Sequence, residues 1–320
     1  MKVAILDDYQ GAALASADWS AVEQRADVVA YADHLDDADA LVERLRDAEV
    51  IVAMRERTPF PKALIERLPN LRLLVTTGAR NASIDVAAAT EAGVTVCGTN
   101  GLAHPTAELT WALILAMLRR IPQEEQAIRE GRWQVDLGED AHGKVLGVLG
   151  LGRLGSQVAK VGQAFGMPVL AWSQNLTRER TDELGVELAT SKEDLLRRAD
   201  IVTIHLVLSD RSRGLLGASD LRQMKPTAYL VNTSRGPIVD EDALVTALRE
   251  RTIAGAALDV FDHEPLPAGH PFLGLDNVLL SPHIGYVSKE NYRVFYGDAV
   301  EGILAFLDGS PVRVIEPPRR

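Results

Sequence analysis

The sequence has few of the features that would link it to an oxidising compartment, a nucleic acid or a membrane. Its 320 residues include one cysteine, Cys97, so no internal disulfide can form and the fold does not depend on oxidation. The formal net charge is −11 and there is no run of Lys or Arg, which argues against a nucleic-acid partner because a phosphate backbone would be repelled. The longest apolar stretch, Trp111–Leu118, is far too short to cross a bilayer.

The beginning of the sequence is also unlike a signal peptide. Two acidic residues, Asp7 and Asp8, come after a short apolar run that follows Lys2. We therefore expect a cytoplasmic protein without a membrane or nucleic-acid partner. A composition of 47% hydrophobic and 25% charged residues is typical of a soluble globular protein, and the length predicts two domains.

Short apolar runs alternate with helical patterns along the chain. A first series of strands is predicted over Lys2–Leu6, Val28–Tyr31, Val50–Ala53, Leu71–Val75 and Val94–Val96. A second series is predicted over Val145–Leu149, Pro168–Trp172, Ile201–His205, Ala228–Val231, Gly255–Asp259 and Val278–Ser281. Alternation of strands and helices predicts an α/β fold with two doubly wound parallel sheets.

Helices are predicted between these strands and at the end of the chain. Their ranges are Ala38–Arg46, Pro61–Arg67, Ile84–Glu91, Pro105–Arg120, Gly152–Phe165, Ser191–Arg198, Asp240–Glu250 and Ser288–Leu307. The helix over Pro105–Arg120 is apolar nearly all round in its middle, which is typical of a helix buried between layers or between subunits. We expect an irregular connection over Gly131–Gly143.

A glycine-rich run follows the first strand of the second series. Gly150-Leu151-Gly152-Arg153-Leu154-Gly155 stands between a predicted strand and a predicted helix, which is the context of a dinucleotide-binding site. Gly150 allows a tight turn, Gly152 lets the backbone approach a pyrophosphate, and Gly155 lets the helix pack on the strand. The alternatives are a turn without a ligand and a site for a methyl-donor nucleotide.

The next predicted strand ends at Trp172, where an acidic residue that binds the adenosine ribose is expected about 20 residues after the glycine loop. The residues there, Ser173-Gln174-Asn175-Leu176-Thr177-Arg178, include no Asp or Glu. Without a carboxylate to repel it, a 2′-phosphate could pair with Arg178 or Arg180. Alternatively, Ser173 and Asn175 hold the ribose of NAD and the arginines are solvated, so the sequence leaves NAD and NADP open.

Three polar residues each lie just beyond the end of a predicted parallel strand of the second series. They are Arg235, Glu264 and His283, and ligands of open α/β sheets bind along that edge. His283 can donate the proton that an alkoxide needs after hydride transfer, and a nearby Glu264 would orient its ring. Arg235 offers a planar fork for a substrate carboxylate. Taken singly, a loop arginine is usually solvated and a lone histidine is usually structural.

Over nearly the whole chain these motifs resemble those of the D-isomer-specific 2-hydroxyacid dehydrogenase family. The segments concerned are the glycine loop, Val231–Gly236, Leu258–Pro265 and Ser281–Gly285, in the family's order. The resemblance implies that Arg235 binds the substrate carboxylate and carbonyl, and that Glu264 and His283 form the acid–base pair. It also implies that Asp259 holds the nicotinamide carboxamide.

The resemblance further implies a domain division and an assembly. A flavodoxin-like substrate domain would comprise residues 1–100 and 287–320, and a Rossmann dinucleotide-binding domain would comprise 101–286, with the cleft between them. A homodimer would form through the long helix and its surroundings. The predicted cofactor contacts are Gly150, Gly152, Arg153, Leu154, Gly155, Ser173, Gln174, Asn175, His205, Thr233, Asp259 and Gly285, and no metal is expected.

The family also binds the substrate carboxylate with backbone N–H groups of a loop after the fourth strand. Besides Arg235, the predicted substrate contacts are Arg55, Gly78, Ala79 and Arg80. In this loop Arg80 stands where a second glycine is frequent, and Ala82 and Ser83 stand where a polar pair is usual. Arg80 either adds a cation for a phosphate or second carboxylate or points outward, and Arg55 either faces the cleft or pairs with Glu56. His104 and Trp133 flank the same region, and we expect a packing role for Trp133.

The function predicted from the sequence is NAD(P)-dependent oxidoreduction of a small D-2-hydroxy acid, mainly as a 2-oxoacid reductase. A second hypothesis is a non-enzymatic dinucleotide sensor, like the transcriptional corepressors that resemble this family. A third keeps the family but changes the substrate to formate, phosphite or phosphoglycerate. The formate branch is disfavoured because those enzymes have Gln where Glu264 stands, and we expect no added regulatory domain after residue 320.

Overall fold

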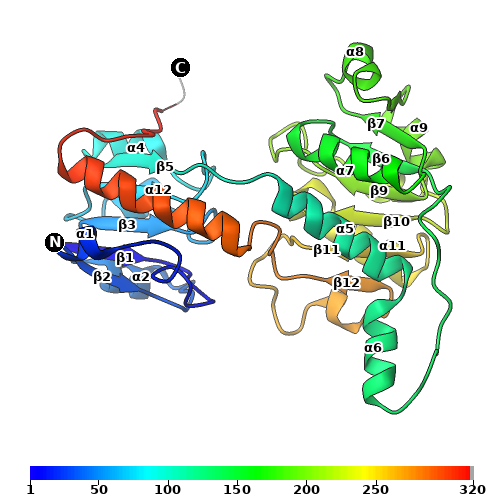
Figure 1. Ribbon diagram of the computed structural model, residues 1–320, viewed down its shortest axis with the longest axis horizontal. Helices are drawn as coiled ribbons and strands as arrows, with labels where there is room; N and C mark the ends of the chain where they lie inside the picture. The colour runs from blue at the N-terminus through cyan, green and yellow to red at the C-terminus, as the bar shows by residue number, and fades with distance from the viewer. Residues whose placement is uncertain (318–320) are drawn as a thin grey trace. The chain divides into compact units, whose positions relative to one another are not determined.

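The computed structural model describes residues 1–317, and the chain forms two compact units (Figure 1). The first unit contains Met1–Leu102 and the chain from Val287 onward, and the second contains Ala103–Tyr286. No helix within residues 1–317 is both long and apolar enough to span a membrane. Each unit has its own sheet and its own buried cluster of apolar side chains.

The sheet of the first unit has five parallel strands in the order β2-β1-β3-β4-β5. They are β1 (Lys2–Ile5), β2 (Asp27–Ala30), β3 (Val50–Ala53), β4 (Leu73–Thr76) and β5 (Thr95–Gly98). Every residue of β3 and β4 is buried, as expected for parallel strands covered on both faces. The strand order reverses between β1 and β3, which makes that edge the binding position of such a sheet.

Five helices belong to this unit. They are α1 (Ser20–Glu23), α2 (Ala38–Leu45), α3 (Lys62–Ile65), α4 (Val86–Glu91) and α12 (Lys289–Leu307). Asp37, Asp85 and Ser288 cap α2, α4 and α12, because each side chain accepts a hydrogen bond from a backbone N–H of the first turn. Helix α12 packs against β4 and α1, so the end of the chain completes the unit with which the chain began.

The sheet of the second unit has seven parallel strands in the order β12-β11-β10-β9-β6-β7-β8. They are β6 (Leu146–Leu149), β7 (Val169–Trp172), β8 (Glu187–Leu188), β9 (Ile201–Ile204), β10 (Tyr229–Asn232), β11 (Gly255–Leu258) and β12 (Val278–Leu280). The order reverses between β6 and β9, as in dinucleotide-binding sheets. The prediction of an α/β fold with two parallel sheets is confirmed.

Seven α-helices flank this sheet. They are α5 (His104–Leu118), α6 (Ile121–Arg129), α7 (Arg153–Ala164), α8 (Arg178–Asp182), α9 (Lys192–Arg198), α10 (Ala218–Leu221) and α11 (Glu241–Arg249), with 3-10 turns over Gly236–Ile238 and Pro271–Gly274. Helix α5 packs against α7, β10 and β11, and its apolar middle is largely buried.

The region after α5 differs from the sequence prediction. The helix predicted to continue to Arg120 ends at Leu118, and Arg120 has a left-handed backbone (φ 55°) that starts the separate helix α6. Pro122 stands in the first turn of α6, where its missing N–H costs nothing. The connection over 131–143 is irregular, as expected, but Trp133 is 75% exposed, so the packing role expected for it is wrong within this chain.

Candidate active site

The glycine loop lies where the second sheet reverses its strand order. Gly150 follows β6 with a left-handed backbone (φ +97°), and a Cβ atom there would lie 2.6 Å from the carbonyl oxygen of His205 after β9. A Cβ atom on Gly155 would lie 1.9 Å from the carbonyl oxygen of Gly150. Glycine at these two positions therefore lets the loop pack against both β9 and helix α7.

Gly152 is different, because a Cβ atom there would meet no atom of the described chain within 4 Å. Gly152 is the N-cap of α7, and no side chain accepts a hydrogen bond from the first turn, which also lacks an acidic residue. Uncapped N–H groups and the positive end of a helix favour an anion. Arg153 and Leu154 begin this turn, so the loop fits the pyrophosphate of a dinucleotide, and the space at Gly152 is the space a ligand would need.

His205 borders the glycine loop and carries an unsatisfied group. Its Nε2 lies 3.0 Å from Oγ1 of Thr203, whereas its buried Nδ1 has no hydrogen-bond partner within residues 1–317. Burial lowers the pKa of His205 to about 4, so the ring is neutral near pH 7. An unpartnered buried nitrogen at this place is a group that a bound ligand can satisfy. Val207, two residues further, is 85% exposed and adds an apolar surface beside the loop.

The segment after β7 carries the residues predicted to contact the ribose. Ser173 is half-buried in a turn closed by a hydrogen bond from the N–H of Leu176, and Gln174 and Asn175 are exposed. The two arginines that follow differ in their surroundings. Nη1 of Arg180 lies 2.8 Å from Oε2 of Glu183, whereas the side chain of Arg178 at the start of α8 makes no hydrogen bond or ion pair with the described part of the chain.

The three polar residues of the predicted catalytic set follow adjacent strands of the second sheet. Arg235 comes after β10, Glu264 after β11 and His283 after β12. Nδ1 of His283 lies 2.5 Å from Oε2 of Glu264, and the second carboxylate oxygen of Glu264 accepts a hydrogen bond from the N–H of Phe261 at 2.9 Å. Both side chains are partly accessible, at 17% and 29%, so they can reach a substrate.

A glycine brings the loop of Arg235 close to the loop of Glu264. A Cβ atom on Gly236 would lie 2.2 Å from the carbonyl carbon of Phe261, so only glycine permits this approach. The backbone carbonyl of Arg235 accepts a hydrogen bond from Nδ2 of Asn232, and its Nη1 donates to the carbonyl of Ser234. The loop that presents Arg235 is therefore fixed at both its backbone and its side chain.

Asp259, the last residue before the loop of Glu264, is 0% exposed. Its carboxylate accepts hydrogen bonds from Oγ of Ser281 at 2.6 Å and from the N–H groups of Ile284 at 2.9 Å and Gly285 at 2.8 Å. Burial raises the pKa of this carboxyl group, although the hydrogen bonds act in the opposite direction. These contacts hold the loop that carries His283, whose backbone is left-handed (φ 53°).

Two threonines of helix α5 also support the site, and the sequence analysis did not find them. Oγ1 of Thr106 donates to the carbonyl of Gly285 at 2.9 Å, and Oγ1 of Thr110 lies 2.9 Å from Oγ1 of the buried Thr233. The signal in the sequence is a pair of polar residues four positions apart on an apolar helix, which share one face.

The predicted substrate contacts of the first unit gather at the ends of β3 and β4. Arg55 has a left-handed backbone (φ 53°) and donates its N–H to Oγ1 of Thr77 at 2.9 Å. A Cβ atom on Gly78 would lie 1.9 Å from Nη1 of Arg55, so the guanidinium lies over that glycine. Nε of Arg55 is 3.7 Å from the carboxylate of Glu56, so the ion pair with Glu56 is loose.

The N–H groups of this loop are not equivalent. The N–H of Gly78 donates to Oγ1 of Thr99 at 2.7 Å and is therefore already used. Ala79 and Arg80 are exposed, and their N–H groups have no backbone or side-chain acceptor within residues 1–317. Of the three loop residues predicted to bind a carboxylate through the backbone, Ala79 and Arg80 therefore have N–H groups that a ligand can use.

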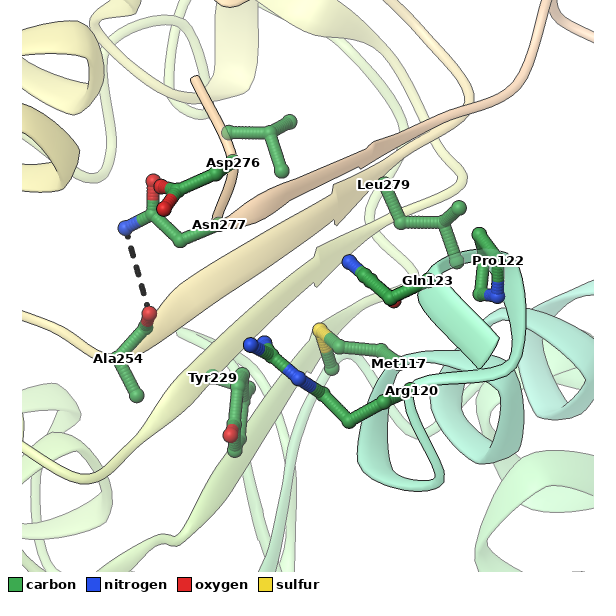
Figure 2. A pocket seen from close by; sticks show the side chains of 10 residues that line it. Met117, Arg120, Pro122, Gln123, Tyr229, Ala254, Asp276, Asn277 and Leu279 are labelled. Atoms are coloured by element: carbon green, nitrogen blue, oxygen red, sulfur yellow. Dashed lines mark hydrogen bonds between the residues drawn. The ribbon is translucent and has the colours of Figure 1, made fainter. Parts of the chain in front are cut away.

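A pocket at the opposite edge of the second sheet is not part of this site (Figure 2). It lies at the amino ends of β10, β11 and β12, where Nδ2 of Asn277 donates to the carbonyl of Ala254 at 3.3 Å. No cluster of three or more His, Cys, Asp or Glu side chains that could hold a metal ion occurs in residues 1–317.

Comparison with known proteins gives consistent similarities. The family model described as D-isomer specific 2-hydroxyacid dehydrogenase, NAD binding domain, matches residues 111–285. A glyoxylate reductase of Aeropyrum pernix is 46% identical over 256 residues, which cover 77% of this chain and 76% of that protein. A D-3-phosphoglycerate dehydrogenase of Methanocaldococcus jannaschii is 39% identical, and the match covers 85% of this chain but only 52% of that protein.

A solved structure is similar over almost its full length. The crystal structure of a phosphoglycerate oxidoreductase from Vibrio cholerae O395 superposes with a TM-score of 0.92 and is 39% identical, covering 97% of this chain and 99% of that one. The chain spans about half the length of the matched phosphoglycerate dehydrogenase from Methanocaldococcus, so similarity to that protein extends to part of it only.

The neutral state of His205 predicts a pH dependence. An unfolded histidine titrates near pH 6.5, whereas the pKa of His205 is about 4, so the unfolded chain binds more protons between these values. The contribution of His205 to the free energy of unfolding is therefore complete above about pH 6.5 and is lost as the pH falls towards 4. NMR should show no titration of the His205 ring from pH 8 to about 5, with His205→Asn identifying its resonance. A midpoint near 6.5 would contradict this assignment.

Proposed function

The chain belongs to the D-isomer specific 2-hydroxyacid dehydrogenase family, NAD-dependent oxidoreductases of 2-hydroxy acids, and we propose that it acts mainly as a reductase of a small 2-oxo acid to the D-2-hydroxy acid. The observation that carries this proposal is the hydrogen bond between Nδ1 of His283 and Glu264, at the strand ends beside the loop of Arg235. Relatives named glyoxylate reductase make glyoxylate the first substrate to test.

The bound nicotinamide would supply the hydride to the carbonyl carbon of the substrate. His283 then donates a proton to the carbonyl oxygen, which becomes the hydroxyl group of the product. Because Nδ1 is engaged by Glu264, the nitrogen that faces the substrate is Nε2. The negative charge of Glu264 stabilises the protonated ring before the transfer and fixes its orientation.

The substrate carboxylate needs a cation and N–H donors. The planar guanidinium of Arg235 can bind the carboxylate and the carbonyl oxygen together and so align the carbon that receives the hydride. In the first unit, the Arg55 side chain and the N–H groups of Ala79 and Arg80 are our candidates for a second set of donors. The buried Asp259 acts mainly by holding the loop of His283, and we keep its contact with the nicotinamide carboxamide as a proposal.

Substitution of His283 tests the reaction. We expect His283→Gln to lower kcat with glyoxylate about 10²- to 10⁴-fold, the usual contribution of a general acid, and to leave the Kd for NADH nearly unchanged. His142→Gln removes an exposed histidine of the same unit and serves as the control. Stopped-flow or steady-state absorbance at the nicotinamide band gives kcat, and fluorescence titration gives Kd.

Two results would contradict this proposal. One is the absence of NADH and NADPH oxidation with glyoxylate, hydroxypyruvate and other 2-oxo acids, and the other is full activity of His283→Gln. A protein partner that binds only with the dinucleotide present, together with negligible turnover, would support the sensor hypothesis instead.

We also propose that the site accepts NADP as well as NAD. The support is the absence of an acidic residue from Ser173 to Arg178, together with an Arg178 side chain that makes no hydrogen bond or ion pair within residues 1–317. Arg180 is less suitable because it is paired with Glu183. A 2′-phosphate between Ser173 and Arg178 would gain a hydrogen bond and a charge contact.

Three substitutions separate the roles of Ser173, Arg178 and Arg180 in cofactor choice. We expect Ser173→Asp to raise the KM for NADPH much more than that for NADH, because the new carboxylate repels the 2′-phosphate. Arg178→Ala should raise the KM for NADPH about tenfold, and the matched Arg180→Ala should have little effect. Steady-state kinetics with both cofactors checks this, and equal effects of Ser173→Asp on NADH and NADPH would rule out discrimination at this position.

A homodimer is the third proposal. Five of the large apolar side chains exposed on the chain fall within one segment, residues 121–137, which forms α6 and the extended stretch after it (Figure 1). They are Ile121, Ile128, Trp133, Val135 and Leu137. Such a group marks an interface more often than isolated exposed residues do. A second copy of the chain is the partner that the family resemblance supports.

The assembly can be tested with one substitution on this segment. Leu137 is 90% exposed, and we expect Leu137→Asp to shift the protein from dimer to monomer in analytical ultracentrifugation, because it would bury a charge at the interface. Leu273→Asp, at another exposed leucine of the same unit, is the control and should leave the dimer intact. A monomeric unsubstituted protein at micromolar concentration would contradict the proposal.

A further inference from the structure

Asp7 occupies an unusual position at the edge of the first sheet. It follows β1 beside the reversal of strand order between β1 and β3, its backbone is left-handed (φ 57°), and its side chain is only 1% exposed. A non-glycine residue in this conformation costs free energy, as does a buried carboxylate, so both must be offset by specific contacts. No step of the proposed reaction uses Asp7.

The contacts of Asp7 join three loops. Its Oδ1 lies 2.8 Å from Nδ1 of His34 in the loop after β2, and its Oδ2 accepts a hydrogen bond from Oγ1 of Thr58 at 2.8 Å in the loop after β3. The backbone carbonyl of Asp7 accepts a further hydrogen bond from Nη1 of Arg57 at 2.9 Å. The other ring nitrogen of His34 faces Asp36 at 3.1 Å, which holds the imidazole against Asp7.

The loop after β3 is the one that carries Arg55, and it is held at its two ends. At the start, the N–H of Arg55 donates to Oγ1 of Thr77, which itself donates to Sδ of Met54 at 3.3 Å. At the end, Thr58 is 2% exposed and bound to the carboxylate of Asp7. The left-handed backbone of Arg55 therefore lies within a short segment whose flanks are both fixed.

Arg57 lies in the same segment, between Arg55 and Thr58. Besides its bond to the carbonyl of Asp7, its guanidinium stacks at 4.5 Å over the ring of Tyr9, two residues after Asp7. Asp7 and Tyr9 thus both contact the guanidinium of Arg57, and the Asp7 carboxylate also binds Thr58 at the end of the loop of Arg55. The acidic neighbour Asp8 makes no such connection within residues 1–317, where its carboxylate accepts hydrogen bonds from the N–H groups of Ala12 and Ala13 in its own segment.

We propose that Asp7 is a positioning residue for substrate binding: its buried carboxylate, bonded to Thr58 and His34, fixes the loop after β3 in the conformation that presents Arg55 to the anionic end of the substrate. This inference rests on the proposed function, because it takes Arg55 as a substrate contact. Loss of the Asp7–Thr58 hydrogen bond would let the loop after β3 sample other conformations. Substrate binding would then have to order this loop, which makes the free energy of binding less favourable. Substrate binding should then weaken, and proton transfer at His283 should not change.

The test uses substitutions at Thr58 that differ by one atom group. Thr58→Val removes the hydroxyl and keeps the shape, and we expect the KM for glyoxylate at saturating NADH to rise about tenfold, with kcat and the Kd for NADH nearly unchanged. Thr58→Ser restores the hydroxyl, and its KM should return close to that of the unsubstituted protein. Asp7→Asn should raise KM in the same direction, and Asp8→Asn is the matched buried control that should not.

A binding measurement keeps this inference separate from the proposed function. Calorimetry with oxalate, an unreactive dicarboxylate, in the presence of NADH should give a Kd about tenfold higher for Thr58→Val than for Thr58→Ser. A first contrary result is that the unsubstituted protein turns over glyoxylate while Thr58→Val and Thr58→Ser show the same KM and the same oxalate affinity. That result would contradict the role of Asp7 but not the proposed reaction. A fall in kcat without a rise in KM would contradict it as well. Absence of both turnover and oxalate binding in the unsubstituted protein would contradict the two proposals together.

Discussion

All strands within each sheet run parallel, and the rest of the molecule depends on that constraint. Within each sheet the chain must cross back before it starts the next strand, so the loops that leave the carboxyl ends collect at one edge. These crossovers contain an α-helix except between β11 and β12, where only the 3-10 turn over Pro271–Gly274 occurs. The shared edge brings residues that are distant in sequence, Arg235, Glu264 and His283, onto neighbouring loops. The helices cover both faces and leave this edge as the place where polar side chains can meet without being buried in a core.

The loops at the carboxyl ends of the strands approach one another closely, and at a few positions this approach requires glycine. Gly150 and Gly155 let the loop after β6 approach both β9 and α7, and Gly236 lets the loop of Arg235 touch the loop of Glu264. Other positions at these edges have non-glycine residues with left-handed backbones, among them His283 and Arg55. Their strain persists because buried carboxylates hold the surrounding loops, Asp259 for His283 and Asp7 for the loop of Arg55.

Much of this arrangement could be predicted from the sequence because the strands are buried on both faces. Continuous apolar runs such as Val50–Ala53 identify such strands directly. The polar residues that follow these runs are then candidates for the site. Short polar helices were not predictable in this way. Helix α6, with the sequence IPQEEQAIR, buries only Ala127, so hardly any apolar pattern marks it apart from Pro122 in its first turn.

The hydrogen bonds that support the site could not be predicted from the sequence either, for a different reason. Thr106, Thr110 and Asp7 act through hydrogen bonds to groups far away in the chain, and the sequence does not show which groups these are. Whether Gly152 faces protein or open space depends on the position of atoms that the sequence does not specify. Motifs therefore indicated the groups that we propose for the chemistry, whereas the residues that hold them required the three-dimensional structure.

The net charge of the chain opposes the binding of anionic ligands. At −11 the protein as a whole repels an anionic cofactor and an anionic substrate, yet both must bind. Ions screen charges beyond about 8 Å at physiological ionic strength, so the distant acidic residues matter less than the groups within hydrogen-bond reach of the ligand. In the proposed function, binding rests on a few donors at the sheet edges, namely the uncapped first turn of α7, Arg235 and Arg55. With so few proposed donors, small displacements of their loops should change ligand affinity strongly, and the hydrogen bonds of the buried carboxylates of Asp7 and Asp259 limit such displacements.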